Sequence, residues 1–307
     1  MDQRQSSLEA LLAGINSGEF KRVAETIAAE IPVRPLADLR SIGQHDESEL
    51  IKHRFLCRGG GILLAGPTGI GKSSFLMQCL IHWSVGLPCF GFEPARALRC
   101  LLIQAENDDG DLAEQRDGVI RGIELLQEVI QVALSRILVC SENTKSGEGL
   151  ISRVHKILGE HTGEDKIDLV VLDPALAYLG GDSSQQKDVG RFLRNWLNPI
   201  LTKFKVGCII AHHTNKPLRG KEKGDWKAGD LAYLGAGSAE WANWSRGVIV
   251  IRSIGSHQVF ELVASKRGGR LRWRDGDDGP RFKSDAVALP DTAAAVAAAA
   301  AAAAPPL

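Results

Sequence analysis

The sequence predicts an α/β fold with a mainly parallel central sheet, antiparallel edge strands and a short N-terminal helical arm. Short apolar runs alternate along the chain with longer segments of helical periodicity, and the last apolar runs follow one another closely. Strands that are apolar on both faces and alternate with helices are typical of a parallel sheet covered on both sides. The closely spaced last strands favour an antiparallel edge.

The chain divides into three parts. Residues 1–50 carry apolar positions at helical spacing followed by a polar, proline-containing stretch, and are predicted to form a helical arm and linker. Residues 51–280 carry the strand–helix alternation and form the core. Residues 281–307 contain an unbroken alanine run from Ala297 to Ala304. Because such a run has no polar face and little to pack with, we interpret this part as a low-complexity tail without function.

The strand candidates of the core are short runs rich in Val, Ile and Leu. They lie at 61–65, 100–105, 136–140, 168–173, 207–212, 247–251 and 259–264. Several of the segments between them are long enough for crossover helices, among them 71–84, 110–134 and 186–204.

Composition and charge exclude some classes of protein. Of the 307 residues, 44% are hydrophobic and 24% are charged, which is ordinary for a globular protein. The absence of a long mixed apolar run or a secretory signal pattern leads us to expect a cytoplasmic protein with no membrane association. Lys plus Arg and Asp plus Glu both total 37. Any argument for nucleic acid must therefore come from local patches of charge.

The cysteines show neither a CxxC pair nor the spacing of a metal site. Most lie in or beside apolar runs, which predicts reduced and buried thiols. They are Cys57, Cys79, Cys89, Cys100, Cys140 and Cys208.

A phosphate-binding motif follows the first strand of the core. It matches GxxxxGK[ST] in full and opens an amphipathic helix, which is the context that the motif requires. Its glycines allow backbone N–H groups to converge on phosphate oxygens at a helix N-terminus. We expect Lys72 to reach the β- and γ-phosphates of ATP and Ser73 to bind Mg²⁺. The nucleotide-binding residues predicted here are Gly66, Pro67, Thr68, Gly69, Ile70, Gly71, Lys72, Ser73 and Ser74.

A second apolar strand ends in an acid, Asp173. Its position after a buried strand downstream of the phosphate loop predicts a second Mg²⁺ ligand. Asp173 is followed by proline rather than glutamate, so the group that activates water must come from elsewhere. Glu106, at the end of the strand after the phosphate-loop helix, is the candidate. Alternatively, Glu106 and the aspartates at 108, 109 and 111 cap the next helix.

These motifs resemble the RecA and DnaB class of ATPases, in which a glutamate at this strand end positions the attacking water. The strand at 207–212 continues into His213, Thr214, Asn215 and Lys216, a version that resembles the small hexameric plasmid-replication helicases of the RepA type and related phage ATPases. The resemblance covers roughly 55–275 and implies a RecA-like P-loop NTPase core. It also implies that His213 senses the γ-phosphate. A metal site at the two histidines is the alternative, but no third ligand lies at a recognisable spacing.

The resemblance further implies that a neighbouring subunit donates a basic residue to the site. In the DnaB type this residue lies in a Lys-x-Arg-x-Gly strand, and here Arg267 and Gly269 match while Ser265 replaces the lysine. The departure leaves Arg267 and Lys266 as the leading candidates. Arg270 and Arg246 remain open, as does a solvated basic strand face.

A long polar segment follows His213 and is implied to be a DNA-binding loop. Basic residues and an aromatic side chain in one loop suit the phosphates and bases of single-stranded DNA. They are Lys216, Arg219, Lys221, Lys223, Trp226 and Lys227. A first such loop is expected at Gly180–Gly190, and a solvated surface loop is the alternative reading of both.

The expected function is an ATP-hydrolysing motor on single-stranded DNA, most like a replicative ring helicase of phage or plasmid type. ATP and Mg²⁺ are the expected cofactors, and a homo-oligomeric ring, with a hexamer as the model, is the expected assembly. A recombinase or repair ATPase that forms filaments is one alternative. A switch ATPase regulated by a replication or other protein partner, and indifferent to DNA, is another.

Overall fold

The structure, a computed structural model, describes residues 34–39, 41–42, 46–214, 237–253, 259–271 and 278–283. The chain divides into two compact units, Met1–Asp46 and Glu47–Leu307. The described part of the first unit holds a short 3₁₀ helix, η1 (Leu36–Asp38). The second unit carries the sheet and every motif of the predicted core.

An eight-stranded sheet organises the second unit, in the order β10-β9-β8-β3-β7-β6-β4-β5. The strands from β3 to β8 are parallel where they pair, whereas β9 and β10 run antiparallel at one edge. This confirms the predicted fold class. The strands are β3 (Gly61–Gly66), β4 (Cys100–Gln104), β5 (Ile137–Ser141), β6 (Leu169–Asp173), β7 (Gly207–His213), β8 (Gly247–Ser253), β9 (Val259–Lys266) and β10 (Asp278–Lys283).

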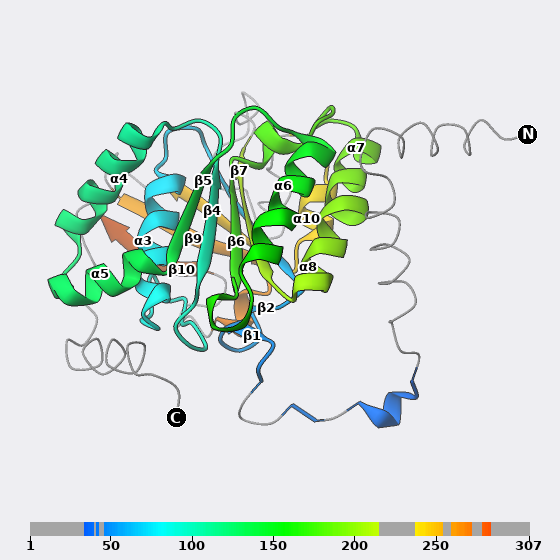
Figure 1. The fold of residues 1–307 in the computed structure, drawn as a ribbon, viewed down its shortest axis with the longest axis horizontal. Coiled ribbons are helices and arrows are strands. Elements are labelled where there is room, and N and C mark those ends of the chain that lie inside the picture. The colour runs from blue at the N-terminus through cyan, green and yellow to red at the C-terminus, as the bar shows by residue number, and fades with distance from the viewer. Residues whose placement is uncertain are drawn as a thin grey trace, which may run out of the picture. The chain divides into compact units, whose positions relative to one another are not determined.

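Helices cover both faces of this sheet, as Figure 1 shows. One layer contains α3 (Lys72–Ser84), α4 (Asp109–Gly122) and α5 (Gln127–Ser135). The other layer contains α6 (Gly147–Glu160), α7 (Gln186–Gly190), the π-helical segment η4 (Arg191–Leu197), α8 (Asn198–Phe204) and α10 (Glu240–Trp244). Short 3₁₀ turns lie at η2 (Gly163–Asp165), η3 (Ala175–Tyr178) and η5 (Gly268–Arg270).

The core explains why the central strands are nearly continuous apolar runs. All residues of β3, β4 and β6 are buried, because each strand has a helical layer on both sides. Leu64 and Leu102 pack in one hydrophobic cluster with Phe75, Leu76 and Leu80 of α3. Full burial of each such side chain stabilises the fold by about 2 kcal/mol, so the phosphate-loop helix is fixed firmly to the sheet.

Several local features differ from the sequence pattern. Residues 49 and 50, assigned to the linker, begin a small antiparallel pair made of β1 (Glu49–Ile51) and β2 (Leu56–Cys57). The segment 110–134 forms two helices, α4 and α5, and 186–204 divides into α7, η4 and α8. Pro199 in the first turn of α8 has no N–H for the preceding helical ladder, which favours a new helix there.

The six cysteines are all free thiols, five of them buried and Cys140 half-buried, as predicted. Among the described residues, no helix is both long and apolar enough to cross a membrane.

Candidate nucleotide site

The phosphate loop joins the end of β3 to the start of α3. Gly69 and Gly71 have φ values of 75° and 92°, in the left-handed region that glycine adopts without strain. A Cβ atom at Gly71 would meet nothing within 4 Å, so the backbone conformation rather than space requires this glycine. Gly71 is also the N-cap of α3 and turns the first N–H groups of the helix toward the loop.

Lys72 is buried, and its amine lies inside the loop. The Nζ atom donates to the carbonyl oxygens of Gly66 and Pro67, each at 2.9 Å. Burial lowers the pKa of Lys72, while the nearby carboxylates of Asp173 and Glu106 act in the opposite direction. The ammonium is therefore held where a phosphate group bound by the loop would be.

Asp173 and Ser73 meet beside the loop. Asp173 ends β6 and is 4% exposed, and the Ser73 hydroxyl is hydrogen-bonded to its carboxylate. Burial raises the pKa of Asp173, and Ser73 and Lys72 oppose that shift. One hydroxyl and one carboxylate are hard oxygen donors of the kind that Mg²⁺ takes from a protein, with the remaining positions left to phosphate and water. The donor set thus fits the predicted ion.

Glu106 follows β4 on the same edge of the sheet. Its carboxylate is close enough to Lys72 and Asp173 to affect the pKa of both. The capping alternative for this region applies to other residues. The Asp108 side chain accepts from the N–H of Asp111 at 2.8 Å and forms a capping box with it at the start of α4. The helix is thus capped without Glu106.

His213 lies next to the loop because β7 pairs with β3. In this register His213 is opposite Gly66. Its Nδ1 atom lies 3.2 Å from Lys72 Nζ and 3.2 Å from Thr68 Oγ1. Burial and the charge of Lys72 lower the pKa of His213. The structure therefore brings together Lys72, Ser73, Glu106, Asp173 and His213, which come from four neighbouring strand ends.

The basic residues predicted to act in trans lie elsewhere. Lys266 pairs with Val248 in β8, which lies beside the beginning of β3, whereas the phosphate loop follows the end of β3. The length of β3 separates the two ends by about 16 Å. Neither Lys266 nor Arg267 is therefore placed to act on the nucleotide of its own chain.

These residues also make contacts within the chain. Lys266 Nζ donates to the carbonyl oxygens of Ala242, Asn243 and Ser245 and so caps the C-terminal end of α10. The guanidinium of Arg267 donates to the carbonyl of Arg54 at 3.2 Å. Arg270 makes a similar contact with His53 at 3.2 Å. The side chain of Arg246 lies against Gly60.

The residues of the predicted second DNA-binding loop lie outside the described part of the chain. They are Lys216, Arg219, Lys221, Lys223, Trp226 and Lys227. The described chain resumes at Gly237, and the N–H of Ser238 donates to the carbonyl of Ser183 at 2.8 Å. The end of this segment therefore returns to the first predicted loop, Gly180–Gly190.

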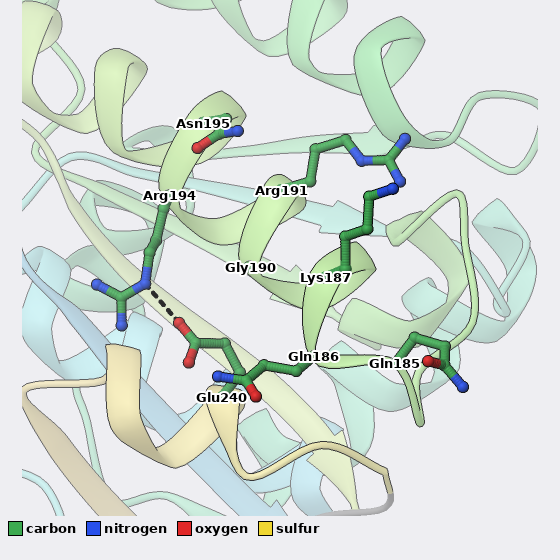
Figure 2. Close-up of a pocket in the computed structure, with 8 residues that line it drawn as sticks. All are labelled: Gln185, Gln186, Lys187, Gly190, Arg191, Arg194, Asn195 and Glu240. Atoms are coloured by element: carbon green, nitrogen blue, oxygen red, sulfur yellow. Dashed lines mark hydrogen bonds and ion pairs between the residues drawn. The ribbon is translucent and has the colours of Figure 1, made fainter. Parts of the chain in front are cut away.

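An open pocket of about 840 Å³ lies at this place (Figure 2). Its cations are Lys187, Arg191 and Arg194, and its only carboxylate among the described lining residues is Glu240. Arg194 Nε pairs with Glu240 Oε1 at 2.5 Å. The complete lining is Gln185, Gln186, Lys187, Gly190, Arg191, Arg194, Asn195 and Glu240. The sequence pattern included Lys187 in a loop but did not single out this set, because helical periodicity over 186–204 gave no sign of a hollow.

Sequence reasoning also missed Gln104. It was read as one position of an apolar strand, but its buried amide contacts Asp173 and the backbone of Glu106. The available signal was a polar residue near the end of a run that is otherwise apolar.

The parallel sheet, the phosphate loop at the end of β3 and the acidic residues at the ends of β4 and β6 define a P-loop ATPase core of the RecA-like class. The family model described as AAA domain matches residues 29–218, more than half of the chain. The chain belongs to this AAA domain family. No curated protein matches the sequence.

Two solved structures illustrate the likeness of fold. The ATPase domain of a helicase matches with a TM-score of 0.52 and 12% identity, over 76% of this chain and 85% of that one. The RadB recombinase matches with a TM-score of 0.46 and 15% identity, over 74% of this chain and 88% of that one. The family match and the fold confirm the predicted recognition, a RecA-like P-loop ATPase of the DnaB type.

Proposed function

We propose that this chain is an ATP-driven motor on single-stranded DNA, most like a replicative ring helicase of phage or plasmid type. The observation that carries the ATPase part is the convergence of Lys72, Asp173, Glu106 and His213 around one phosphate loop. These side chains supply the charge, the metal ligand, the base and the sensor that phosphoryl transfer to water requires.

In this mechanism the loop N–H groups and Lys72 hold the β- and γ-phosphates of ATP. Ser73 and Asp173 would hold Mg²⁺, which when bound neutralises charge on the phosphate oxygens. Glu106 accepts a proton from a water molecule that attacks the γ-phosphorus. The bond from this phosphorus to the β,γ-bridging oxygen breaks, and ADP and phosphate leave. His213 stays neutral and presents a ring nitrogen to the phosphate side of the loop.

The pocket of Figure 2 supports the nucleic-acid part of the proposal. Three cations face one carboxylate, and the amides of Gln185, Gln186 and Asn195 complete the lining. Cations with neutral hydrogen-bond donors suit a phosphodiester backbone without reading its sequence. Arg191 also lies over the ring of Trp196, 5.8 Å from its centroid, which fixes one of the cations in place.

Subunit contact is the remaining part of the proposal. Arg267 lies across the sheet from the nucleotide site of its own chain, so it can serve only the site of a neighbour. This placement supports a homo-oligomeric ring, with six subunits as the model. The alternatives remain a filament-forming recombinase or repair ATPase and a partner-regulated switch ATPase.

The decisive measurement is steady-state ATP hydrolysis with and without single-stranded DNA, with Lys72→Ala as the blank. We expect turnover that depends on Lys72 and rises with DNA, and a loss of about 10²-fold or more in the blank. Lys72-dependent turnover that ignores DNA would instead favour the switch. Electron microscopy with DNA then separates closed rings from the extended filaments of a recombinase.

The pocket has its own test, the binding of a labelled oligo(dT) measured by fluorescence anisotropy. Lys187→Ala and Arg194→Ala should each weaken binding and reduce the salt dependence by about one counterion. Lys156→Ala is the matched control, because this exposed lysine pairs with Glu160 on α6 and does not line the pocket. Unchanged binding in both pocket variants would remove the pocket from the proposal.

A further inference from the structure

Gln104 occupies an unusual position, as a buried amide at the end of a central strand. It is the last residue of β4, is 2% exposed, and lies in register with Asp173 of β6. An amide buried between apolar layers lowers stability unless its donors and acceptor are bonded. Its partners therefore show why an amide is accommodated there.

Both ends of this amide are bonded to the nucleotide site. The Oε1 atom accepts the backbone N–H groups of Ala105 at 2.9 Å and of Glu106 at 3.2 Å. The Nε2 atom donates to Asp173 Oδ2 at 3.4 Å. One rigid planar group thus connects the carboxylate proposed to bind the metal with the backbone of the residue proposed to activate water.

This connection has a geometric consequence. Glu106 is exposed and begins the turn between β4 and α4, so its direction depends on how its backbone is held. The capping box at Asp108 fixes the far end of that turn. Gln104 fixes the near end, through the N–H of Glu106 itself.

We propose that Gln104 is a positioning residue for ATP hydrolysis, setting the Glu106 backbone relative to the Asp173 carboxylate. This inference rests on the proposed roles of Glu106 and Asp173. Gln104 does not touch the reacting atoms. Its loss therefore alters the placement of the attacking water more than the binding of nucleotide.

The test compares basal turnover, measured without DNA, in Gln104→Met and Gln104→Glu. Methionine fills a similar volume but has neither the donor nor the carbonyl acceptor. Glutamate keeps an acceptor for the two N–H groups but loses the donor to Asp173. Ser245→Ala is the control, since Ser245 is also buried, donates to the Trp241 carbonyl at 2.8 Å, and lies at the other edge of the sheet.

We expect kcat to fall by about tenfold to a hundredfold in both Gln104 variants. KM for ATP, and the affinity for a fluorescent ATP analogue measured with Mg²⁺, should stay within about twofold of wild type. The control should keep its kcat while its melting temperature falls by a similar amount. If Gln104→Met does not fold, Gln104→Glu alone carries the test.

Three outcomes would overturn the inference: a normal kcat in the folded Gln104 variants, a fall in affinity as large as the fall in kcat, or an equal loss of kcat in Ser245→Ala. Glu106→Gln is measured in parallel to separate this failure from that of the proposed function. If wild type turns over ATP and Glu106→Gln does not, a normal Gln104→Met sinks the positioning role alone. If wild type shows no Lys72-dependent turnover, the proposed function fails first and the inference falls with it.

Discussion

The amine of Lys72 and the Nδ1 atom of His213 lie 3.2 Å apart across the phosphate loop. A lysine ammonium can only donate, so Nδ1 of His213 must accept and carries no proton. The same Nδ1 atom lies 3.2 Å from the hydroxyl of Thr68, which can also donate to it. The ring is therefore the neutral tautomer with its proton on Nε2.

The first prediction concerns pH. Because burial and Lys72 lower the pKa of His213, its neutral form persists below the ordinary value of about 6.5. We expect kcat/KM for ATP to hold down to about that pH and to fall only on further acidification, when protonated Nδ1 can no longer accept from Lys72. His213→Gln, which keeps an acceptor but cannot titrate, should lose this acid limb. An identical limb in both proteins would exclude His213 as its source.

The second prediction concerns the residue that activates water. Glu106→Gln should keep the affinity for ATP and lose turnover by about 10²-fold or more, because the amide cannot accept the proton. The neighbouring variant Asp108→Asn is the matched control, since asparagine is as good an N-cap as aspartate. Single-turnover hydrolysis and nucleotide binding measure the two effects. Normal turnover in Glu106→Gln would leave this residue without a catalytic role.

The third prediction concerns subunit contact. Arg267→Ala and Lys72→Ala should each be inactive as pure proteins. A mixture should recover part of the turnover, because some interfaces would combine the intact Lys72 of one subunit with the intact Arg267 of another. The readout is ATP hydrolysis across mixing ratios. A mixture no more active than its components would contradict action in trans.

The fourth prediction concerns stability. Asp168 is 8% exposed, pairs with Arg58 and Arg96, and accepts the backbone N–H of Arg99. Asp168→Asn leaves these cations without their carboxylate and should lower the free energy of unfolding by about 3 kcal/mol. In the control Asp165→Asn, the lost pair with Arg99 involves an exposed carboxylate and should cost under about 1 kcal/mol. Urea unfolding measures both, and equal losses would refute the prediction.

The sequence predicted the central strands well because these strands are buried on both faces, which leaves uninterrupted apolar runs. It could not predict β2, whose two residues are too few for a pattern, or β10, whose Gly279 and Pro280 interrupt any alternation. The first strand pair, β1 with β2, was therefore read as linker and core edge.

The site shows the same division. Lys72, Ser73 and Asp173 follow from motif spacing, since a phosphate loop and an acid after a buried strand have few other uses together. The contact of Gln104 with Asp173 arises from the register between β4 and β6, which no local pattern specifies. The pocket at Arg194 and Glu240 joins residues far apart in the chain, and only the packing of α10 beside α7 and η4 brings them together.

Helix α10 is too short to hold its own shape. With five residues it spans little more than one turn, and an isolated turn is unstable in water. Its order is supplied from outside, by Lys266 at its C-terminal end, by Arg194 through Glu240, and by the ring of His212 against Trp241, with centroids 4.7 Å apart. These three contacts come from the strand of the trans candidate, the cationic pocket and the strand of His213. Local melting of α10 is thus coupled to all three, and its folding is conditional on the arrangement of the regions around it.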